Sequence, residues 1–246
     1  MVIMNKKILI LGHRGYRKKF PENTLLAFSK AFECGADGIE CDVQKSADGV
    51  YFIFHDVELQ RMTGFYGYID RENSDKLKTL DAGKGERIPD LDSFLESLPA
   101  DKFINIELKE ETLTVKDARM ILEKLNKKNL KNNILISSFK HELLPPFKRS
   151  GFKTGLLFET DSLKEQPLKQ IFDIVRYRPW SVHPPVNIFT EDLILSIKLF
   201  VFAAKILKKK FVFWTVNSDM QYNAVKDFAY AVITDDVEVM IKLRDN

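Results

Sequence analysis

The sequence predicts an α/β fold: a somewhat irregular, closed (β/α)8 TIM barrel formed by all 246 residues as a single domain. Short apolar runs of strand length recur along the chain. Segments with helical spacing of apolar residues separate most of these runs, and strand alternating with helix indicates a parallel sheet. The alternation repeats about eight times, which favours a closed barrel over an open sheet.

Nine runs have the length and composition of strands, one more than the barrel needs. They cover residues 8–11, 38–43, 50–54, 103–108, 134–138, 154–158, 181–183, 211–216 and 231–234. Residues 44–49 contain a turn, Ser46-Ala47-Asp48-Gly49, and no helix. The second and third runs therefore either pair as a hairpin, or one of them is irregular.

Helical periodicity predicts helices over residues 24–34, 91–98, 115–127, 168–176, 191–208, 221–228 and 237–243. Residues 57–87, which follow the third strand-like run, are rich in glycine, charge and aromatic residues and show no long helix. We expect a small insertion at the site end of the barrel. Long loops in compact domains are often lids or binding elements.

Composition excludes several classes of protein. Charges of both signs are interleaved, and a net charge of +3 is too small to indicate a nucleic-acid partner. Cys34 and Cys41 provide neither a disulfide framework nor zinc spacing. Near the amino terminus, two lysines precede only about four apolar residues, too few for a signal peptide. The longest apolar stretch, residues 193–207, is interrupted by lysines and is too short to span a bilayer. We expect a cytoplasmic protein without stable membrane insertion.

Carboxylates alternate along two of the predicted strands. Because successive side chains of a strand point to opposite faces, Glu40 and Asp42 share one face of theirs. Asn105, Glu107 and Lys109 likewise share one face of another strand. Ionised groups inside a barrel require a partner, because Val, Ile and Leu normally fill that space.

Three carboxylates in one polar region would repel one another, and some would take up protons. A hard divalent cation resolves this by accepting oxygen ligands. The sequence therefore predicts Glu40, Asp42 and Glu107 as metal ligands; the alternative is that they are surface or salt-bridged carboxylates. No His or Cys cluster has zinc spacing, which favours Mg²⁺ or Ca²⁺ and leaves the choice between them open.

His13 and His55 each end an apolar run, where the active sites of barrels lie. Such a pair can divide the work of general acid and general base near neutral pH. Arg14 and Lys109 supply positive charge for a phosphate, or act as counter-ions to the carboxylates, and both roles can coexist. Trp214, near a strand end, is expected to line the pocket.

Four further residues carry weaker expectations. Asn23 is expected to fix the turn before the first helix, a structural role. Cys41 should point away from its carboxylate neighbours into the core. His183 ends a strand and is expected in the pocket lining, whereas His141 is expected to be exposed without a partner.

Several motifs follow one another along nearly the whole chain. They are His13-Arg14-Gly15, Pro21-Glu22-Asn23-Thr24, Glu40-Cys41-Asp42-Val43, Asp48-Gly49 leading to His55-Asp56, Leu80-Asp81-Ala82-Gly83, Arg87-Ile88-Pro89 with Leu91, Glu107-Leu108-Lys109, Trp214-Thr215-Val216-Asn217 and Ile233-Thr234-Asp235. In this order the set resembles the glycerophosphodiester phosphodiesterase family. Any single motif would be weak, but the set is specific.

The resemblance implies a (β/α)8 barrel with a small insertion after His55. It also implies functional residues, all of them present here: a divalent metal on Glu40, Asp42 and Glu107, His13 and His55 as acid–base pair, and Arg14 and Lys109 at the phosphate. Departures are peripheral. The helix after Pro89 lacks the usual acidic pattern, and Asp235-Asp236 lacks the proline that often follows.

The implied reaction is metal-dependent hydrolysis of glycerophosphodiesters to sn-glycerol 3-phosphate and an alcohol. The nucleophile is either the glycerol 2-hydroxyl, as in phospholipase C-type barrels, or water. Two alternatives remain: a sphingomyelinase D-like or other phospholipase-type phosphodiesterase on the same barrel, and a non-catalytic binder of glycerol phosphate. The sequence does not indicate the head group or the oligomeric state.

Overall fold

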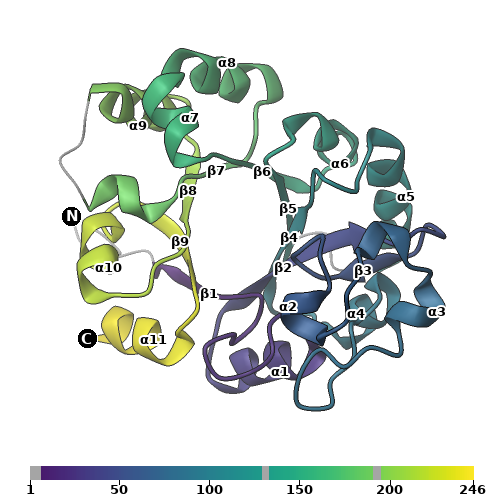
Figure 1. Cartoon of the computed structure of the whole chain (residues 1–246). Helices are drawn as coiled ribbons and strands as arrows, with labels where there is room; N and C mark the ends of the chain where they lie inside the picture. Colours follow the sequence, from purple (N-terminus) through teal and green to yellow (C-terminus); the bar gives the residue numbers. More distant parts are fainter. Residues whose placement is uncertain (1–6, 129–132, 191–194) are drawn as a thin grey trace.

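The structure is a computed structural model that describes residues 7–128, 133–190 and 195–246. Eight parallel strands form a closed barrel, in agreement with the predicted fold class (Figure 1). They are β1 (Leu9–His13), β2 (Gly38–Lys45), β4 (Phe103–Leu108), β5 (Ile134–Ser138), β6 (Lys153–Leu157), β7 (Ser181–His183), β8 (Lys210–Phe213) and β9 (Ala229–Thr234). Strand β1 pairs with both β2 and β9, which closes the ring.

The ninth strand candidate lies outside the barrel. Strand β3 (Tyr51–Ile53) pairs antiparallel with the end of β2, with Val43 opposite Ile53. The turn between them is held by Ser46, whose backbone nitrogen donates to the carbonyl oxygen of Val50 at 2.9 Å. Of the two arrangements that the sequence allowed, the hairpin is therefore the one formed.

Helices surround the barrel on the outside (Figure 1). They are α1 (Leu25–Glu33), α4 (Leu91–Ser97), α5 (Val115–Asn126), α6 (Pro145–Arg149), α7 (Thr160–Glu165), α8 (Pro167–Tyr177), α9 (Leu195–Ile206), α10 (Asp219–Val225) and α11 (Val237–Asp245), with 3-10 turns η3 (His141–Leu143) and η4 (Val186–Phe189). Helices α6 and α7 were not expected, because five or six residues are too few to show a period. The first four residues of the helix expected over 191–208 lie outside the described residues.

The segment after His55 folds into short pieces with a small core of their own. It contains α2 (Gln60–Thr63), η1 (Ile69–Arg71) and α3 (Ser74–Leu77). Their apolar core consists of Phe52, Phe54, Leu59, Ile69, Leu77, Leu80, Ala82 and Ile88. Because this core includes Phe52 of β3 and Phe54 just after it, the segment is anchored against the hairpin (Figure 1).

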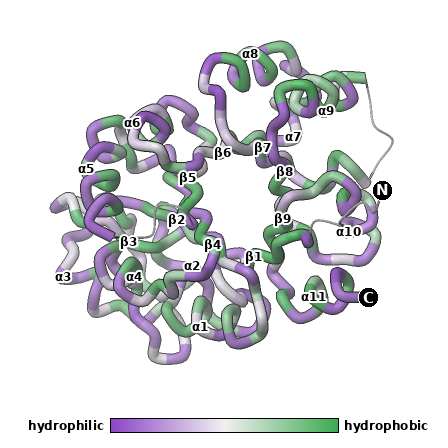
Figure 2. The backbone as a smooth tube through the Cα atoms, turned by 180° about the vertical axis from the view of Figure 1, so that it is seen from behind, coloured by the Kyte–Doolittle hydropathy of each residue, from purple (hydrophilic) through white to green (hydrophobic). Residues whose placement is uncertain are grey.

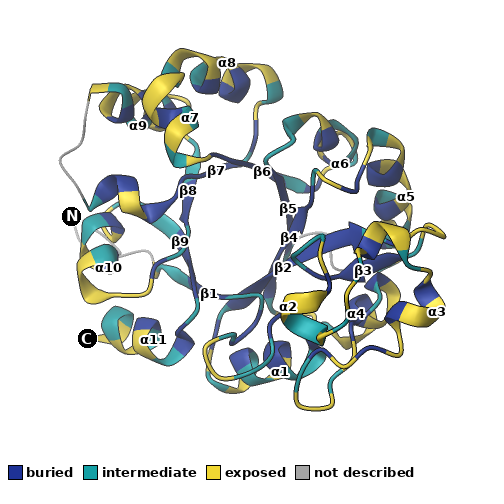
Figure 3. Ribbon diagram, viewed as in Figure 1, coloured by how far each residue is buried: buried dark blue, intermediate teal, exposed yellow. Residues whose placement is uncertain are grey.

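The strands separate two apolar layers. Outward-facing residues such as Cys41, Ile104 and Ile106 pack beneath the helices, so Cys41 is a core residue as expected. A smaller cluster joins Leu11, Phe103, Leu135, Val212, Ala231 and Ile233. The strands are almost wholly buried, whereas the outer sides of the helices are exposed (Figure 3). Seen from behind, hydrophobic and hydrophilic stretches alternate along the chain (Figure 2).

Among the described residues, we find no helix with the length and apolarity needed to cross a bilayer.

Candidate active site

The eight residues that the sequence predicted as catalytic, metal-binding or substrate-binding line one cavity of about 320 Å³. They are His13, Arg14, Glu40, Asp42, His55, Glu107, Lys109 and Trp214, and the lining also includes Asn105, Phe139, Leu157, Thr215 and Ile233. Most come from the carboxyl ends of strands, where the active sites of barrel enzymes lie. The sequence therefore located the cavity, and it missed mainly the apolar part of the wall.

Three buried carboxylates meet in this cavity. Glu40, Asp42 and Glu107 each offer an oxygen, and these oxygens lie within 4.8 Å of one another. Burial and the nearby Asp42 and Glu107 charges raise the pKa of Glu40 well above its ordinary value. Burial and Asp42 also raise the pKa of Glu107 to about 7, against the opposing effect of Lys109. The three groups therefore do not ionise together at neutral pH without added positive charge.

Asp42 differs from its two neighbours, because cations surround it. Its carboxylate lies 3.3 Å from Nε of Arg14 and accepts a hydrogen bond from the Asn23 amide at 2.9 Å. Burial alone would raise the pKa of Asp42, but Arg14, His55 and Lys109 lower it below the ordinary value. Asp42 is thus the carboxylate of the three that stays ionised.

A sharp turn after β1 places Arg14 and Asn23. Arg14 and Asn23 both have left-handed φ angles, 52° and 57°, and the backbone nitrogen of Asn23 donates to the Arg14 carbonyl at 2.9 Å. Gly15 has φ 83°, and a Cβ atom there would lie 2.6 Å from the backbone of Ala27, so the turn requires glycine. The structural role expected for Asn23 is present, and its side chain holds Asp42 in addition.

His13 is fixed by a carboxylate from the other end of the chain. Its Nδ1 atom lies 2.7 Å from Oδ1 of Asp235, and its Nε2 atom lies 3.9 Å from Oε2 of Glu40. Asn217 holds Asp235 in turn, through its amide group at 2.9 Å. Burial lowers the pKa of His13 and outweighs the hydrogen bond to Asp235, which raises it. The ring therefore presents Nε2 to the carboxylate cluster.

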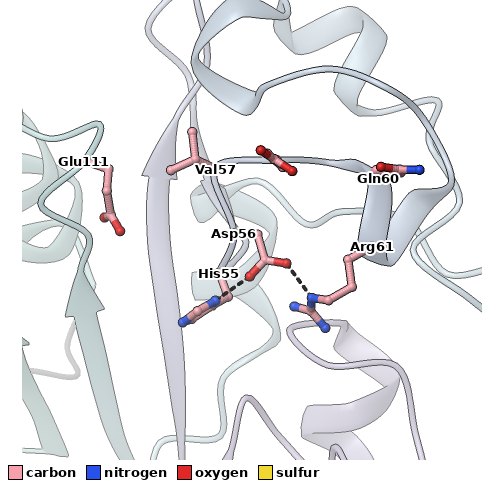
Figure 4. A pocket seen from close by; sticks show the side chains of 7 residues that line it. His55, Asp56, Val57, Gln60, Arg61 and Glu111 are labelled. Carbon is pink, nitrogen blue, oxygen red and sulfur yellow. Dashed lines mark hydrogen bonds and ion pairs between the residues drawn. The ribbon is translucent and has the colours of Figure 1, made fainter.

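His55 is fixed in the same way, by its neighbour in the sequence. Its Nδ1 atom lies 2.7 Å from Oδ1 of Asp56, whose other oxygen accepts from Nε of Arg61 at 2.5 Å (Figure 4). Arg61 also donates to Glu22 at 2.5 Å, and Glu22 accepts from Arg14 at 2.8 Å. A chain of ion pairs thus connects the insertion to both sides of the cavity. Glu111 lies across the shallow hollow beside His55 (Figure 4).

Lys109 lies between the carboxylates and His55. Its Nζ atom is 3.0 Å from Oε1 of Glu107 and 3.5 Å from Nε2 of His55. Burial opposes its charged form, but Glu107 and Asp42 raise the pKa of Lys109 above its ordinary value. It is therefore a fixed positive charge next to the second histidine.

Trp214 forms part of an apolar wall of the cavity. Its indole nitrogen donates to the carbonyl oxygen of His183 at 2.8 Å, and its ring meets Phe139 edge to face at 5.8 Å. His183 itself does not line this cavity, contrary to expectation. Its ring is fully buried beside Ser181 at 2.8 Å, in space that the absent side chain of Gly155 leaves free.

The expectation for His141 was wrong. The ring is largely buried, with Nε2 3.0 Å from the carbonyl oxygen of Leu157 and Nδ1 3.3 Å from Asp173. Both partners are far along the chain, so no local pattern indicates them. Asp56 and Asp235, which hold the two histidines, were present in the motifs but were given no role. Arg61 had no signal in the sequence beyond its place in the insertion.

Comparison with known proteins agrees with this geometry. A sequence profile of the glycerophosphoryl diester phosphodiesterase family matches residues 13–239. The chain belongs to this family. The resemblance predicted from the motifs is thereby confirmed, and with it the class of the chain as a phosphodiesterase enzyme.

Individual relatives match over almost their full lengths. A glycerophosphodiester phosphodiesterase of Caldanaerobacter subterraneus is 33% identical, over 96% of this chain and 98% of the relative. The crystal structure of glycerophosphodiester phosphodiesterase from Thermotoga maritima has a TM-score of 0.81 and 33% identity, covering 96% and 98% of the two chains. A phosphodiesterase of Oleispira antarctica, in complex with its product sn-glycerol-3-phosphate, has a TM-score of 0.83 and 25% identity, covering 98% of each chain.

Proposed function

We propose that this chain is a metal-dependent phosphodiesterase that hydrolyses glycerophosphodiesters to sn-glycerol 3-phosphate and an alcohol. One observation carries the proposal: a single cavity holds two carboxylate-oriented histidines, three clustered carboxylates and two cations. Family membership supports the reaction class. The product bound to the Oleispira relative supports the identity of the product. We treat the chain as one catalytic domain that includes the insertion, residues 57–87.

Glu40, Asp42 and Glu107 would hold the divalent ion, Mg²⁺ or Ca²⁺. The residues fit such an ion, because all three are buried and one carboxylate oxygen of each lies within 4.8 Å of the others. One ion can therefore contact all three oxygens. The raised pKa values of Glu40 and Glu107, despite the nearby Arg14 and Lys109, support the binding of an additional cation at the cluster. When bound, the ion supplies Lewis-acid charge that polarises the phosphodiester.

The two histidines would move the protons. Because Asp235 and Asp56 engage the two Nδ1 atoms, each ring keeps Nε2 for the substrate. One histidine takes the proton from the attacking hydroxyl, and the other gives a proton to the departing alkoxide as its bond to phosphorus breaks. The attacking hydroxyl belongs to the glycerol 2-position, which gives a cyclic phosphate that water must then open to sn-glycerol 3-phosphate, or to water itself. A cyclic phosphate trapped by rapid quench would identify the first route.

Arg14 and Lys109 would bind the phosphodiester. Both are buried cations in the lining, and both already face carboxylates at 3.3 Å or less. Positive charge held in place before reaction opposes the negative charge that grows on the phosphate oxygens. Trp214 and Phe139 offer an apolar wall for the carbon atoms of the glycerol or the alcohol.

The two cysteines, Cys34 and Cys41, are unpaired thiols, which fits the reducing cytoplasm that we propose as the location.

A substrate panel tests the proposal. Purified protein is incubated with glycerophosphocholine, glycerophosphoethanolamine, glycerophosphoinositol, sphingomyelin and phosphatidylinositol, and each product is quantified. We expect sn-glycerol 3-phosphate from at least one glycerophosphodiester, and no turnover of the two lipids. Turnover of sphingomyelin or phosphatidylinositol alone would identify a different phosphodiesterase on the same barrel. Saturable binding of glycerol 3-phosphate without turnover of any compound would identify a binding protein.

A further inference from the structure

An apolar stripe follows the outer side of α9. Its members stand three or four residues apart, the spacing that places side chains on one helix face. They are Leu195, Leu199, Phe202 and Ile206, with exposed fractions of 83%, 39%, 63% and 62%. The opposite face of the helix is the one that meets the core, through Ile197, Phe200 and Ala204. The stripe is therefore additional to the apolar face that folding requires.

Helix α8, which packs against α9, repeats this arrangement. Its core-facing residues are Gln170, Asp173 and Ile174, whereas Leu168, Phe172 and Val175 are exposed by 50% or more. Together with Leu207, the two stripes form one outer surface, the α8–α9 surface. Figure 1 shows the two helices side by side at the periphery, and Figure 3 shows the exposure of their outer sides.

This surface is exceptional for the molecule. Most of the large apolar side chains that are exposed within the described residues lie on α8 and α9, and the others are scattered over the insertion, α5, α10 and α11. Single exposed apolar residues are normal, but a contiguous set marks a surface that binds a partner or a membrane.

The charges around the stripe are positive. Residues 195–210 contain five lysines, Lys198, Lys205, Lys208, Lys209 and Lys210, and no Asp or Glu. Helical spacing places Lys198 and Lys205 along one flank of the α9 stripe, and Lys169 and Arg176 along one flank of the α8 stripe. Within α8 and the described part of α9 the acidic residue is Asp173, which lies on the buried face, and the exposed Asp161 and Glu165 belong to the neighbouring helix α7.

We propose that the α8–α9 surface docks on an anionic phospholipid bilayer. Helices with an apolar face and lysines beside it lie in the interfacial layer, with the apolar side chains at the acyl boundary and the cations near the phosphates. Charge favours this occupant over a second copy of the chain, because two copies meeting through residues 195–210 would bring lysines of both copies together, and this range contains no carboxylate.

Docking in this orientation leaves the cavity free. None of the α8–α9 surface residues belongs to the cavity lining. Bound and unbound protein should therefore hydrolyse a water-soluble glycerophosphodiester at the same rate.

Flotation with vesicles tests the proposal. The full chain is mixed with vesicles of phosphatidylcholine alone, or of phosphatidylcholine and phosphatidylglycerol at a 7:3 ratio, at low and high salt. We expect binding to the anionic vesicles at low salt and little binding in the other arms. The double variant Phe202→Gln, Ile206→Gln should bind about tenfold more weakly or worse, since it removes two inserted apolar side chains. The variant Lys198→Gln, Lys208→Gln should lose roughly fivefold for each lysine.

Control variants test whether a loss of vesicle binding is specific to the α8–α9 surface. Met120→Gln with Met220→Gln removes exposed apolar side chains of α5 and α10 and should leave vesicle binding unchanged. Lys116→Gln with Lys127→Gln is the control for charge. Circular dichroism and thermal unfolding confirm that every variant is folded. Failure of wild type to bind the anionic vesicles, or an equal loss in the controls, would overturn the proposal. So would a wild-type dimer that the Phe202→Gln, Ile206→Gln variant dissociates, since the surface would then be a contact between copies.

Discussion

In each histidine of the cavity, Nδ1 lies 2.7 Å from Oδ1 of an aspartate. The two aspartates come from different parts of the sequence. Asp56 follows His55 directly, whereas Asp235 lies 222 residues from His13. A hydrogen bond at Nδ1 fixes the tautomer and the orientation of the ring, so that Nε2 alone is available for proton transfer. In the proposed mechanism, proton transfer by the two histidines thus depends on two aspartates outside the cavity lining.

Replacing Asp235 tests this dependence. In Asp235→Asn the amide can stabilise the wrong tautomer of His13, and we expect kcat to fall by about 10²-fold or more. The pH profile of kcat should change as well, because the protonated ring loses its counter-charge. Asp219→Asn, an exposed aspartate on α10, serves as the control and should leave kcat unchanged. A normal kcat and pH profile in Asp235→Asn would contradict the positioning role.

Glu22 makes the stability of the molecule depend on pH. Burial opposes its ionisation, but Arg61 and Arg14 lower its pKa from 4.5 to about 2. Because the pKa is lower in the folded state, the stabilisation is fully present above about pH 4.5 and is lost as the pH falls toward 2. Glu22→Gln should lower the free energy of unfolding at pH 7 by on the order of 2–3 kcal/mol. Urea unfolding should show this difference shrinking by half or more at pH 3. A constant difference would contradict the linkage.

At the scale of elements, the insertion contributes to the active site through one side chain. Arg61 of α2 donates to Asp56 and to Glu22, and so connects the insertion to His55. Its side chain is about half exposed, but its partner Glu22 is buried, so the ion pair contributes to stability as well. The effect of Arg61 should therefore appear in catalysis and, to a smaller extent, in folding.

Arg61→Gln should lower kcat by about tenfold, the scale on which supporting residues of a site act. It should lower the free energy of unfolding at pH 7 by about 1 kcal/mol, less than Glu22→Gln does, because Arg14 still pairs with Glu22. Arg71→Gln is the matched control, because Arg71 lies in the same insertion but stacks on Tyr68 at 4.4 Å, away from the histidine. Steady-state kinetics of both variants decides the question. Equal losses of kcat in the two variants would show that the insertion affects catalysis through its overall shape and not through Arg61.

Much of the fold and of the site was predictable because the signals are local. The alternation that puts Glu40 and Asp42 on one face depends only on the strand period, and the eight residues predicted for the site all belong to the cavity lining. Helices α6 and α7 escaped prediction because they are too short to show a period. The partners of His141 and the link from Arg61 to Glu22 depend on tertiary contacts between distant residues. No local pattern encodes such contacts.

At the scale of the whole molecule, the barrel holds charged groups where its strands would otherwise bury apolar ones. In the metal-free protein, the pKa of Glu107 rises to about 7. A carboxyl whose folded pKa is raised favours folding below its unfolded value, near 4.5, and this contribution is lost as the pH rises toward 7. Metal-free protein should therefore lose stability over this range, while its affinity for a divalent cation increases.

Thermal unfolding with and without metal measures how strongly a divalent cation stabilises the fold at each pH. Mg²⁺ or Ca²⁺ at about a hundred times its Kd at pH 7.5 should raise Tm by about 5–10 °C at that pH, and the same concentration should raise Tm by less at pH 5.5, where the affinity is lower. Glu40→Gln relieves repulsion in the cluster, so its metal-free Tm should equal or exceed that of wild type, and its metal-induced shift should be small. A metal-induced shift of wild-type size in this variant would contradict the assignment of Glu40 as a ligand.

One measurement tests the central claim most directly: release of sn-glycerol 3-phosphate from glycerophosphocholine by wild type and His13→Ala, each with EDTA, Mg²⁺ or Ca²⁺. We predict release by wild type with at least one of the two metals, none with EDTA, and a kcat lower by about 10²–10⁴-fold in His13→Ala, the usual contribution of general acid–base catalysis. Full activity in EDTA, or a loss below about tenfold in the variant, would contradict a metal-dependent site that acts through its histidines.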